Sequence, residues 1–228
     1  MKILKKLTAY LYLGSIFIGL LFLLPFLYIF RSKNKIIRAT WSKYILKLLF
    51  IDVKVEGVKD ETSDMFILNH QSLLDIIVFE SVTNRDIAWI AKKEIAEVPI
   101  YGHMLKAPNM ITVDRENKAG LLKLLKDVKE KFNQNRPIVI FPEGTRGDGK
   151  TLKKFKAGSK LIAQKNGFKV QPVLLLNTRE RLDSFSMTGS KGLVKVIYMD
   201  TISDFSDKKW FDNLYIDMQQ KLTEELNR

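Results

Sequence analysis

A long apolar run near the start of the chain most constrains what this sequence can fold into. Leu7 to Phe30 is almost uninterrupted hydrophobe, enough for about 36 Å of helix at 1.5 Å per residue, which matches the hydrocarbon core of a bilayer. Met1 to Lys6 is basic like the start of a signal peptide, but the run is too long for one and no small-x-small cleavage site follows it. The sequence therefore predicts an uncleaved membrane segment, with a fully buried soluble helix as the alternative.

Basic residues flank this run on both sides. Residues 1–51 contain nine Lys and Arg and no acid, so they hold most of the net charge of +13. The positive-inside rule then places both ends of the run, and the domain that follows, on the cytoplasmic face. Pro25 lies near the end of the run, where it could break the helix and allow a shallow re-entry instead of a full crossing.

The stretch from Ile36 to Phe50 has the pattern of a basic amphipathic helix. Apolar residues recur at helical spacing, at Ile37, Trp41, Tyr44, Ile45 and Leu48. Such a helix beside a membrane segment is typical of one that lies in the interface against anionic lipid; packing on a soluble domain is the alternative. Because the basic charge adjoins a bilayer-length run, the sequence favours an anionic membrane surface as partner and no nucleic acid.

From Asp52 onward short apolar runs alternate with charged helical stretches, which is typical of an α/β domain. Strands are expected at 53–56, 65–68, 87–90, 110–113, 137–141, 170–176 and 193–198, and helices from about 72, at 118–133, at 155–165 and near the C-terminus. The sequence therefore predicts an α/β fold: a mixed sheet flanked by helices in residues 52–228, after a membrane anchor and basic amphipathic helix in residues 1–51. The chain has no cysteine, which excludes disulfides, thiolate zinc sites and a cysteine nucleophile.

The stretch Asn69 to Asp75 carries the first candidate catalytic residues. His70 lies between an expected strand and an expected helix, and imidazole is the side chain best suited to move a proton near neutral pH. A carboxylate such as Asp75 can fix its tautomer. Five helical residues turn the chain by about 500°, so the pair meets only if His70 precedes the helix and the loop curls back. Ser72 to Asp75 also resembles a capping box, so Asp75 as a helix cap beside an ordinary histidine is the alternative.

Two further stretches suit phosphate binding. Arg115 follows an expected strand, and arginine presents a planar fork of donors that matches a phosphate; a local ion pair is the alternative. In the turn Phe141 to Arg146, Gly144 lets the backbone approach a ligand closely. Arg146 can hold a phosphate there, while Glu143 can orient Arg146 or accept from a substrate hydroxyl.

Residues 144–151, Gly-Thr-Arg-Gly-Asp-Gly-Lys-Thr, satisfy the P-loop pattern of nucleotide-binding proteins. A membrane-associated nucleotidase is therefore an alternative function. A P-loop lysine lies in the first turn of its helix, however, and the next helix is expected only from about Phe155. The nucleotide hypothesis also leaves His70, Asp75 and the apolar run unexplained.

Four stretches in order resemble the motifs of the glycerolipid acyltransferases, the lysophosphatidate acyltransferase type in particular. The resemblance covers roughly Val53 to Tyr198 and is carried by Asn69–Asp75, Ile111–Arg115, Phe141–Arg146 and the proline-centred Val170–Val173. The sequence departs from the family pattern at Leu73, Gly147 and Asn109, where an aromatic residue, serine and glycine are frequent.

The resemblance implies transfer of a fatty acyl group from a thioester, coenzyme A or acyl carrier protein, to the sn-2 hydroxyl of 1-acyl-sn-glycerol 3-phosphate, giving phosphatidate. It implies catalytic roles for His70 and Asp75 and acceptor binding by a second group, Arg115, Glu143, Gly144, Thr145 and Arg146. Direct attack without an acyl-enzyme is expected, with backbone donors near Ser72 as candidates for stabilising the oxyanion. We expect no metal or cofactor. The basic surface suits both an acidic acyl carrier protein and coenzyme A phosphates, and glycerol 3-phosphate or another lysophospholipid is the alternative acceptor.

Overall fold

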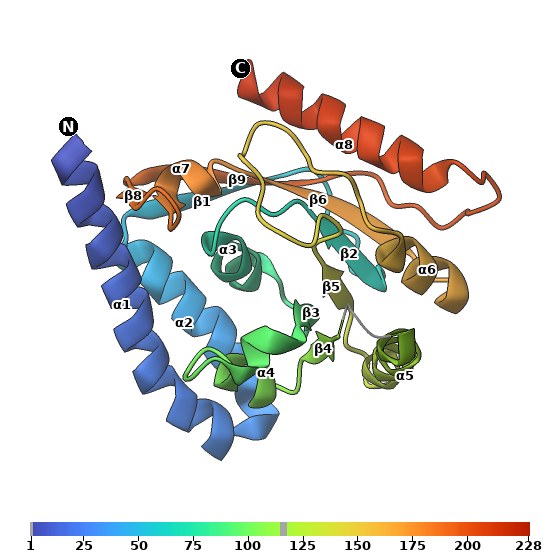
Figure 1. Cartoon of the computed structure of the whole chain (residues 1–228), viewed down its shortest axis with the longest axis horizontal. Helices are drawn as coiled ribbons and strands as arrows, with labels where there is room; N and C mark the ends of the chain where they lie inside the picture. Colours follow the sequence, from blue (N-terminus) through green and yellow to red (C-terminus); the bar gives the residue numbers. More distant parts are fainter. Residues whose placement is uncertain (1, 115–117) are drawn as a thin grey trace.

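Seven strands form one mixed sheet with helices on both faces in the computed structural model, which describes residues 2–114 and 118–228 (Figure 1). The strand order is β1-β9-β6-β2-β5-β3-β4. The strands are β1 (Ile51–Glu56), β2 (Met65–Leu68), β3 (Ala88–Lys92), β4 (Ile111–Val113), β5 (Ile138–Ile140), β6 (Val170–Leu176) and β9 (Gly192–Tyr198), with a separate hairpin of β7 (Leu182–Asp183) and β8 (Thr188–Gly189). The helices are α1 (Lys2–Ile29), α2 (Asn34–Leu48), α3 (Leu74–Val82), α4 (His103–Lys106), α5 (Lys118–Asn133), α6 (Ala157–Asn166), α7 (Thr178–Arg181) and α8 (Trp210–Leu226), with short 3₁₀ turns η1 (Arg31–Lys33) and η2 (Lys93–Glu97).

The direction of the strands decides where loops can meet. Strands β6, β2, β5, β3 and β4 run parallel to one another, while β9 is antiparallel to β6 and β1 runs with β9. The carboxyl ends of the five parallel strands therefore lie at one edge of the sheet. Ligand sites of open α/β sheets lie outside such an edge, so the segments after β2, β5 and β6 are brought together there.

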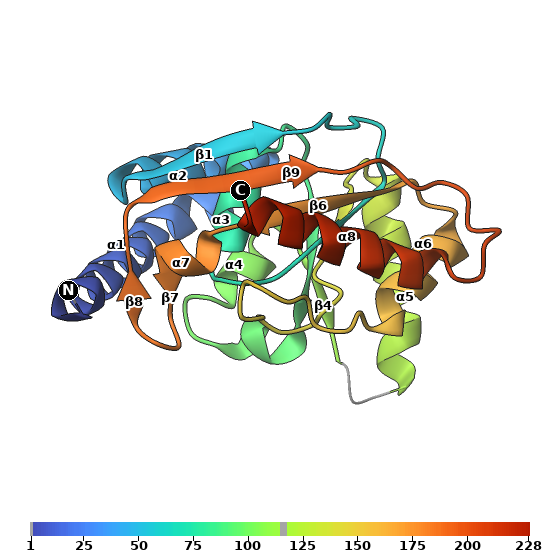
Figure 2. The same ribbon diagram turned by 90° about the horizontal axis from the view of Figure 1, so that it is seen from above.

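Helices lie on both faces of the sheet (Figure 2), and a hydrophobic cluster fills the space on each face. One cluster joins side chains of α1, α2 and α3 to Phe66, Val173 and Val196 of the sheet. The other joins α5, α6 and α8 to strand residues such as Ile67 and Leu174. All four residues of β2 are buried, because this strand lies inside the sheet with helices on both sides, as its unbroken apolar sequence indicates.

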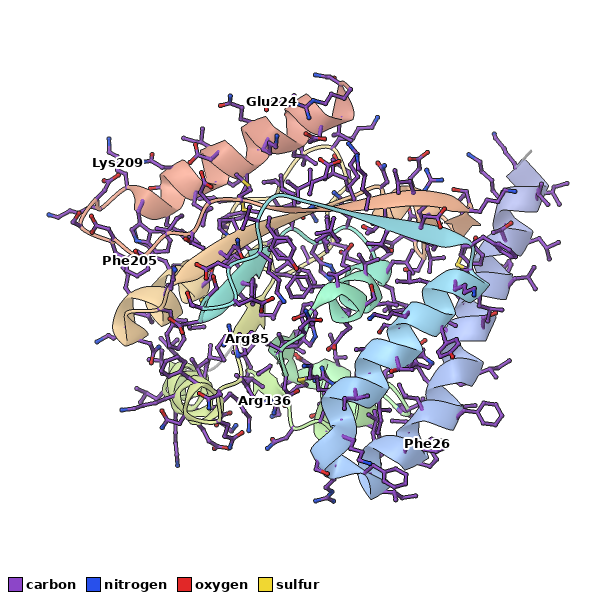
Figure 3. All side chains as sticks on the ribbon, turned by 180° about the vertical axis from the view of Figure 1, so that it is seen from behind. Phe26, Arg85, Arg136, Phe205, Lys209 and Glu224 are labelled. Carbon is purple, nitrogen blue, oxygen red and sulfur yellow. The ribbon has the colours of Figure 1, made fainter. Side chains whose placement is uncertain are left out.

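The apolar run forms α1, a helix of 28 residues that is long and apolar enough to cross a membrane by length and composition. The helix continues through Pro25 to Ile29, so the possible break at the proline does not occur. The chain reverses at η1, and α2 returns against α1. One face of α1 packs on α2 and the β7–β8 hairpin. Only 28% of the residues in the most apolar stretch of α1 are buried. The other face of the helix exposes large apolar side chains, among them Phe26, which is labelled in Figure 3.

The packed face of α2 includes part of the expected apolar face. Ile37, Trp41 and Ile45 pack against the core, whereas Tyr44 and Leu48 are exposed. Arg38 is also buried, at 3% exposure. The Arg38 guanidinium donates to Glu80 of α3 and to Asp86, and Asp86 also pairs with Arg136. A buried charge is tolerated when such partners satisfy it. Because its partners lie more than 40 residues away, the local sequence pattern does not indicate the burial of Arg38.

Candidate active site

The His70 and Asp75 side chains meet at the carboxyl end of β2. The Nδ1 atom of His70 lies 2.7 Å from Oδ2 of Asp75. Helix α3 begins at Leu74, so His70 lies before the helix and the loop curls back over its first turn, as the spacing requires. A carboxylate partner at Nδ1 indicates that the proton sits on that nitrogen, which leaves Nε2 as the proton acceptor. No described residue hydrogen-bonds to Nε2, and the His70 side chain is 18% exposed.

The Asp75 carboxylate is fully buried and receives four hydrogen bonds. Oδ2 accepts from His70 and from the backbone N–H groups of Gln71 and Ser72, at 2.6 and 2.8 Å, and Oδ1 accepts from the Thr178 hydroxyl at 2.5 Å. Asp75 therefore both caps the start of α3 and bonds to His70, so the two interpretations are combined in one side chain. The amides of Gln71 and Ser72 donate to Asp75, so these two are not free to serve as oxyanion donors.

The His70 ring is held on its face and at its backbone. It stacks on Phe141 with ring centroids 3.9 Å apart, and Phe141 stacks in turn on Trp89. Glu143 accepts the His70 backbone N–H at Oε1 and the Lys153 backbone N–H at Oε2, both at 2.7 Å. Burial raises the pKa of Glu143, opposed by these two hydrogen bonds. Both carboxylate oxygens of Glu143 thus accept backbone N–H groups, and Glu143 does not orient the Arg146 guanidinium, which bonds to other residues.

Arg146 lines a cavity beside His70. Its Nη1 donates to the Ser184 hydroxyl at 2.7 Å, and its guanidinium lies 4.6 Å from the centre of the Phe185 ring. Gly144 has a φ of 71°, the left-handed conformation that favours glycine in this turn, and Thr145 is exposed. Arg115, the other expected phosphate ligand, lies outside the described residues.

The cavity has a volume of about 600 Å³ and extends from the site into the space between the N-terminal helices and the sheet. Its wall includes His70 and Gly144–Arg146 and is otherwise mainly apolar, with Leu13, Leu20, Trp41, Ile77 and Leu105. The volume lies within the range of about 300–1,000 Å³ that is common for small-molecule sites. Helices α1 and α2 therefore form part of the wall of the site.

The stretch 144–151 does not form a P-loop. Helix α6 begins only at Ala157, six residues after Thr151. The amides of Lys150 and Thr151 both donate to Asp148, and the amide of Gly147 donates to the His70 carbonyl. A P-loop cradles phosphates with such backbone N–H groups; because these three have internal partners, the nucleotidase hypothesis is wrong on the geometry.

Several residues of the site were not predicted from the sequence. Thr178, Ser184 and Phe185 come from the segment after β6, which forms the short α7 and the β7–β8 hairpin. Asn69 is fully buried and exchanges two hydrogen bonds with the Leu175 backbone, which fixes the motif to β6. A polar residue directly after the buried β6 is the one sequence signal that could have indicated Thr178, since the carboxyl ends of parallel strands meet.

The fold and the site define a class: an α/β protein with a histidine–carboxylate pair at the carboxyl edge of its sheet, beside a mainly apolar cavity whose wall includes an arginine. The family model described as Acyltransferase matches residues 51–176. A 1-acyl-sn-glycerol-3-phosphate acyltransferase of Helicobacter pylori strain J99 is 40% identical over 208 residues, 90% of this chain and 87% of that protein. The chain belongs to the acyltransferase family and is an acyltransferase.

Other relatives extend the comparison. A lyso-ornithine lipid O-acyltransferase of Rhizobium meliloti is 31% identical over 113 residues, 49% of this chain and 38% of that protein. The crystal structure of the 1-acyl-sn-glycerophosphate acyltransferase PlsC from Thermotoga maritima aligns with a TM-score of 0.80 at 23% identity, covering 100% of this chain and 99% of that one. This structural match confirms the mixed α/β fold.

Proposed function

We propose that this enzyme transfers a fatty acyl group from a thioester to the sn-2 hydroxyl of 1-acyl-sn-glycerol 3-phosphate, making phosphatidate for phospholipid synthesis. The observation that carries the proposal is the His70–Asp75 pair beside a mainly apolar cavity with Arg146 in its wall. A pair that moves a proton, an apolar space for a chain and a cation for a phosphate are the three parts that such a reaction needs. The activity for which the Helicobacter pylori relative is named agrees with it.

In the proposed reaction neutral His70 accepts the proton of the acceptor hydroxyl at Nε2 while the hydroxyl oxygen attacks the thioester carbonyl. Asp75 stabilises the imidazolium that forms. The tetrahedral intermediate collapses with cleavage of the carbon–sulfur bond, and the imidazolium returns its proton to the departing thiolate. No acyl-enzyme and no metal ion take part, so EDTA should leave the rate unchanged.

The acceptor phosphate is assigned to Arg146, with Arg115 as a second ligand, and the turn of Gly144 and Thr145 passes beside it. Arg146 supports this assignment because its guanidinium lines the same cavity as His70 and, among the described residues, contacts the Ser184 hydroxyl and the Phe185 ring alone. Glu143 serves the acceptor indirectly, by holding the backbone of His70.

The exposed apolar face of α1 supports membrane attachment. We propose that residues 1–51 attach the chain to an anionic membrane surface and keep residues 52–228 on the cytoplasmic face. A reporter fused after Arg228 should be inaccessible to a membrane-impermeant label in intact cells. Clear external labelling would reverse the topology.

To test which acceptor and which donor the enzyme uses, acyl transfer by the purified protein is measured for every combination of the following donors and acceptors. The donors are an acyl-coenzyme A and an acyl–acyl carrier protein, and the acceptors are lysophosphatidate, glycerol 3-phosphate, lyso-ornithine lipid and a lysophospholipid without a free phosphate monoester. We expect the highest kcat/KM with lysophosphatidate. A higher kcat/KM with another acceptor would reassign the substrate while leaving the acyltransferase class intact.

A further inference from the structure

Thr178 contacts the catalytic pair from a distant part of the chain. Among the described residues, it is the only one outside 70–75 that hydrogen-bonds to the Asp75 carboxylate, with Oγ1 donating to Oδ1 at 2.5 Å. Thr178 and Asp75 are both fully buried. A buried hydrogen bond to a charged group is among the stronger interactions in a protein, and removal of one partner leaves the other unsatisfied.

The backbone around Thr178 is built to hold this hydroxyl in place. Asn177 has a φ of 67°, a left-handed conformation that turns the chain sharply from the end of β6 into α7. The same segment is tied to the motif on both sides of Thr178. Asn69 exchanges two hydrogen bonds with Leu175, and the Ser72 hydroxyl donates to the Leu182 carbonyl at 2.6 Å.

The two oxygens of Asp75 are used unequally. Oδ2 accepts from His70 and from two backbone amides, whereas Oδ1 has the Thr178 hydroxyl alone among the described residues. This hydroxyl therefore decides whether Oδ1 is satisfied in the folded protein. It also draws negative charge toward Oδ1 and away from the oxygen that faces His70.

We propose that Thr178 is a positioning residue of the active site: its hydroxyl fixes the Asp75 carboxylate and thereby sets the orientation and the basicity of His70. The inference rests on the proposed function, since it deepens the role of the same pair. Thr178 touches neither substrate nor a reacting atom, and it acts through Asp75. The arrangement is a three-part network in which β2, the start of α3 and the segment after β6 each supply one group.

The test compares three variants with the wild type. Thr178→Val keeps the shape and removes the donor, Thr178→Ser keeps the donor, and Thr83→Val is the matched control because Thr83 is also buried but caps the far end of α3. In Thr178→Val we expect kcat to fall about ten- to hundredfold, because a carboxylate that is no longer fixed at Oδ1 holds the His70 ring less well in its reactive orientation, with KM within about twofold. Thr178→Ser should recover most of kcat, and Thr83→Val should leave it unchanged.

A second readout does not depend on activity. The chain has two histidines, so histidine-selective NMR can follow the titration of His70 beside that of His103, which bonds to Tyr28. Without the Thr178 hydroxyl, less of the Asp75 charge is drawn toward Oδ1, and the imidazolium is better stabilised by Oδ2. The His70 titration midpoint should therefore rise in Thr178→Val. It should not rise in Thr178→Ser or Thr83→Val. Glu143 also interacts electrostatically with His70 and Asp75, and it is the same in all variants.

Unchanged kcat and an unchanged His70 midpoint in Thr178→Val would overturn the proposal, as would an equal loss in Thr83→Val. If Thr178→Val does not fold, Thr178→Ala replaces it with the same expectations. Failure of both to fold while Thr178→Ser folds would assign the hydroxyl to folding and also overturn the positioning role. If the wild type transfers no acyl group, the proposed function fails, and the NMR comparison still decides the role of Thr178.

Discussion

Replacement of Asp75 by asparagine separates its two roles, since the amide keeps the shape and loses the charge. Its carbonyl oxygen can accept the three hydrogen bonds now made to Oδ2, and its NH₂ can donate to the Thr178 hydroxyl, which also has acceptor capacity. Every buried group then retains a partner. We therefore expect Asp75→Asn to fold, with a loss of stability of about 1–3 kcal/mol from the weaker, uncharged hydrogen bonds.

The rate should respond far more than the stability. Two unit charges about 4 Å apart attract by about 4 kcal/mol at an effective dielectric constant of about 20. This stabilisation of the imidazolium disappears with the carboxylate charge, which corresponds to about a thousandfold in rate. We expect kcat to fall by about 10²–10⁴ while the affinity for the acceptor stays within a few-fold.

Thermal melts and single-turnover acyl transfer on matched samples measure both quantities. Asp64→Asn is a suitable control, because Asp64 caps a backbone N–H of Lys169 at the opposite edge of the sheet, just before β2. It should change stability without a comparable change in rate. The double variant with His70→Ala should lose little more than His70→Ala alone, since the two residues act as one unit. An Asp75→Asn enzyme with near wild-type kcat, or strictly additive losses, would refute the pairing and leave Asp75 as a helix cap.

Three further predictions follow from the surroundings of the pair. Arg146→Ala should raise KM for the phosphorylated acceptor about ten- to hundredfold in steady-state assays, and Arg146→Lys should rescue poorly because lysine lacks the bidentate fork; unchanged KM would move the phosphate site. Lys150→Ala should leave acyl transfer intact, and purified protein should show no magnesium-dependent ATP binding by calorimetry. Burial raises the pKa of Glu143, so its contribution to stability is present at low pH and is lost as the pH rises through the folded pKa; melts across pH should show this loss in the wild type and not in Glu143→Gln.

The sequence predicted the regular core closely because each element has a clear apolar pattern. The expected strands at 65–68 and 170–176 and the helix at 118–133 coincide with β2, β6 and α5. The site followed from the same logic: His70 and Glu143–Arg146 end adjacent parallel strands, so the sheet brings them together. The expected encounter of His70 and Asp75 required only that the helix begin after His70, which a capping serine indicated.

The parts that could not be predicted depend on contacts between distant segments. The segment 177–189 has no apolar period, yet α7 and the β7–β8 hairpin supply Thr178, Ser184 and Phe185 to the site. Likewise, burial of Arg38 depends on Glu80 and Asp86, which no local pattern of α2 reveals. The helix or strand propensity of a segment depends on that segment alone, whereas these residues are positioned by contacts with partners elsewhere in the fold.

The proposed reaction requires His70 to act as the general base in acyl transfer to lysophosphatidate. The most direct measurement is phosphatidate formation by purified wild type and His70→Ala, with 1-acyl-sn-glycerol 3-phosphate and each thioester donor in phospholipid vesicles. We predict that the wild type forms phosphatidate, and that His70→Ala folds and binds the acceptor but loses kcat by about 10²–10⁴. A folded His70→Ala enzyme with undiminished kcat, or a wild type that forms no phosphatidate from either donor, would contradict the claim.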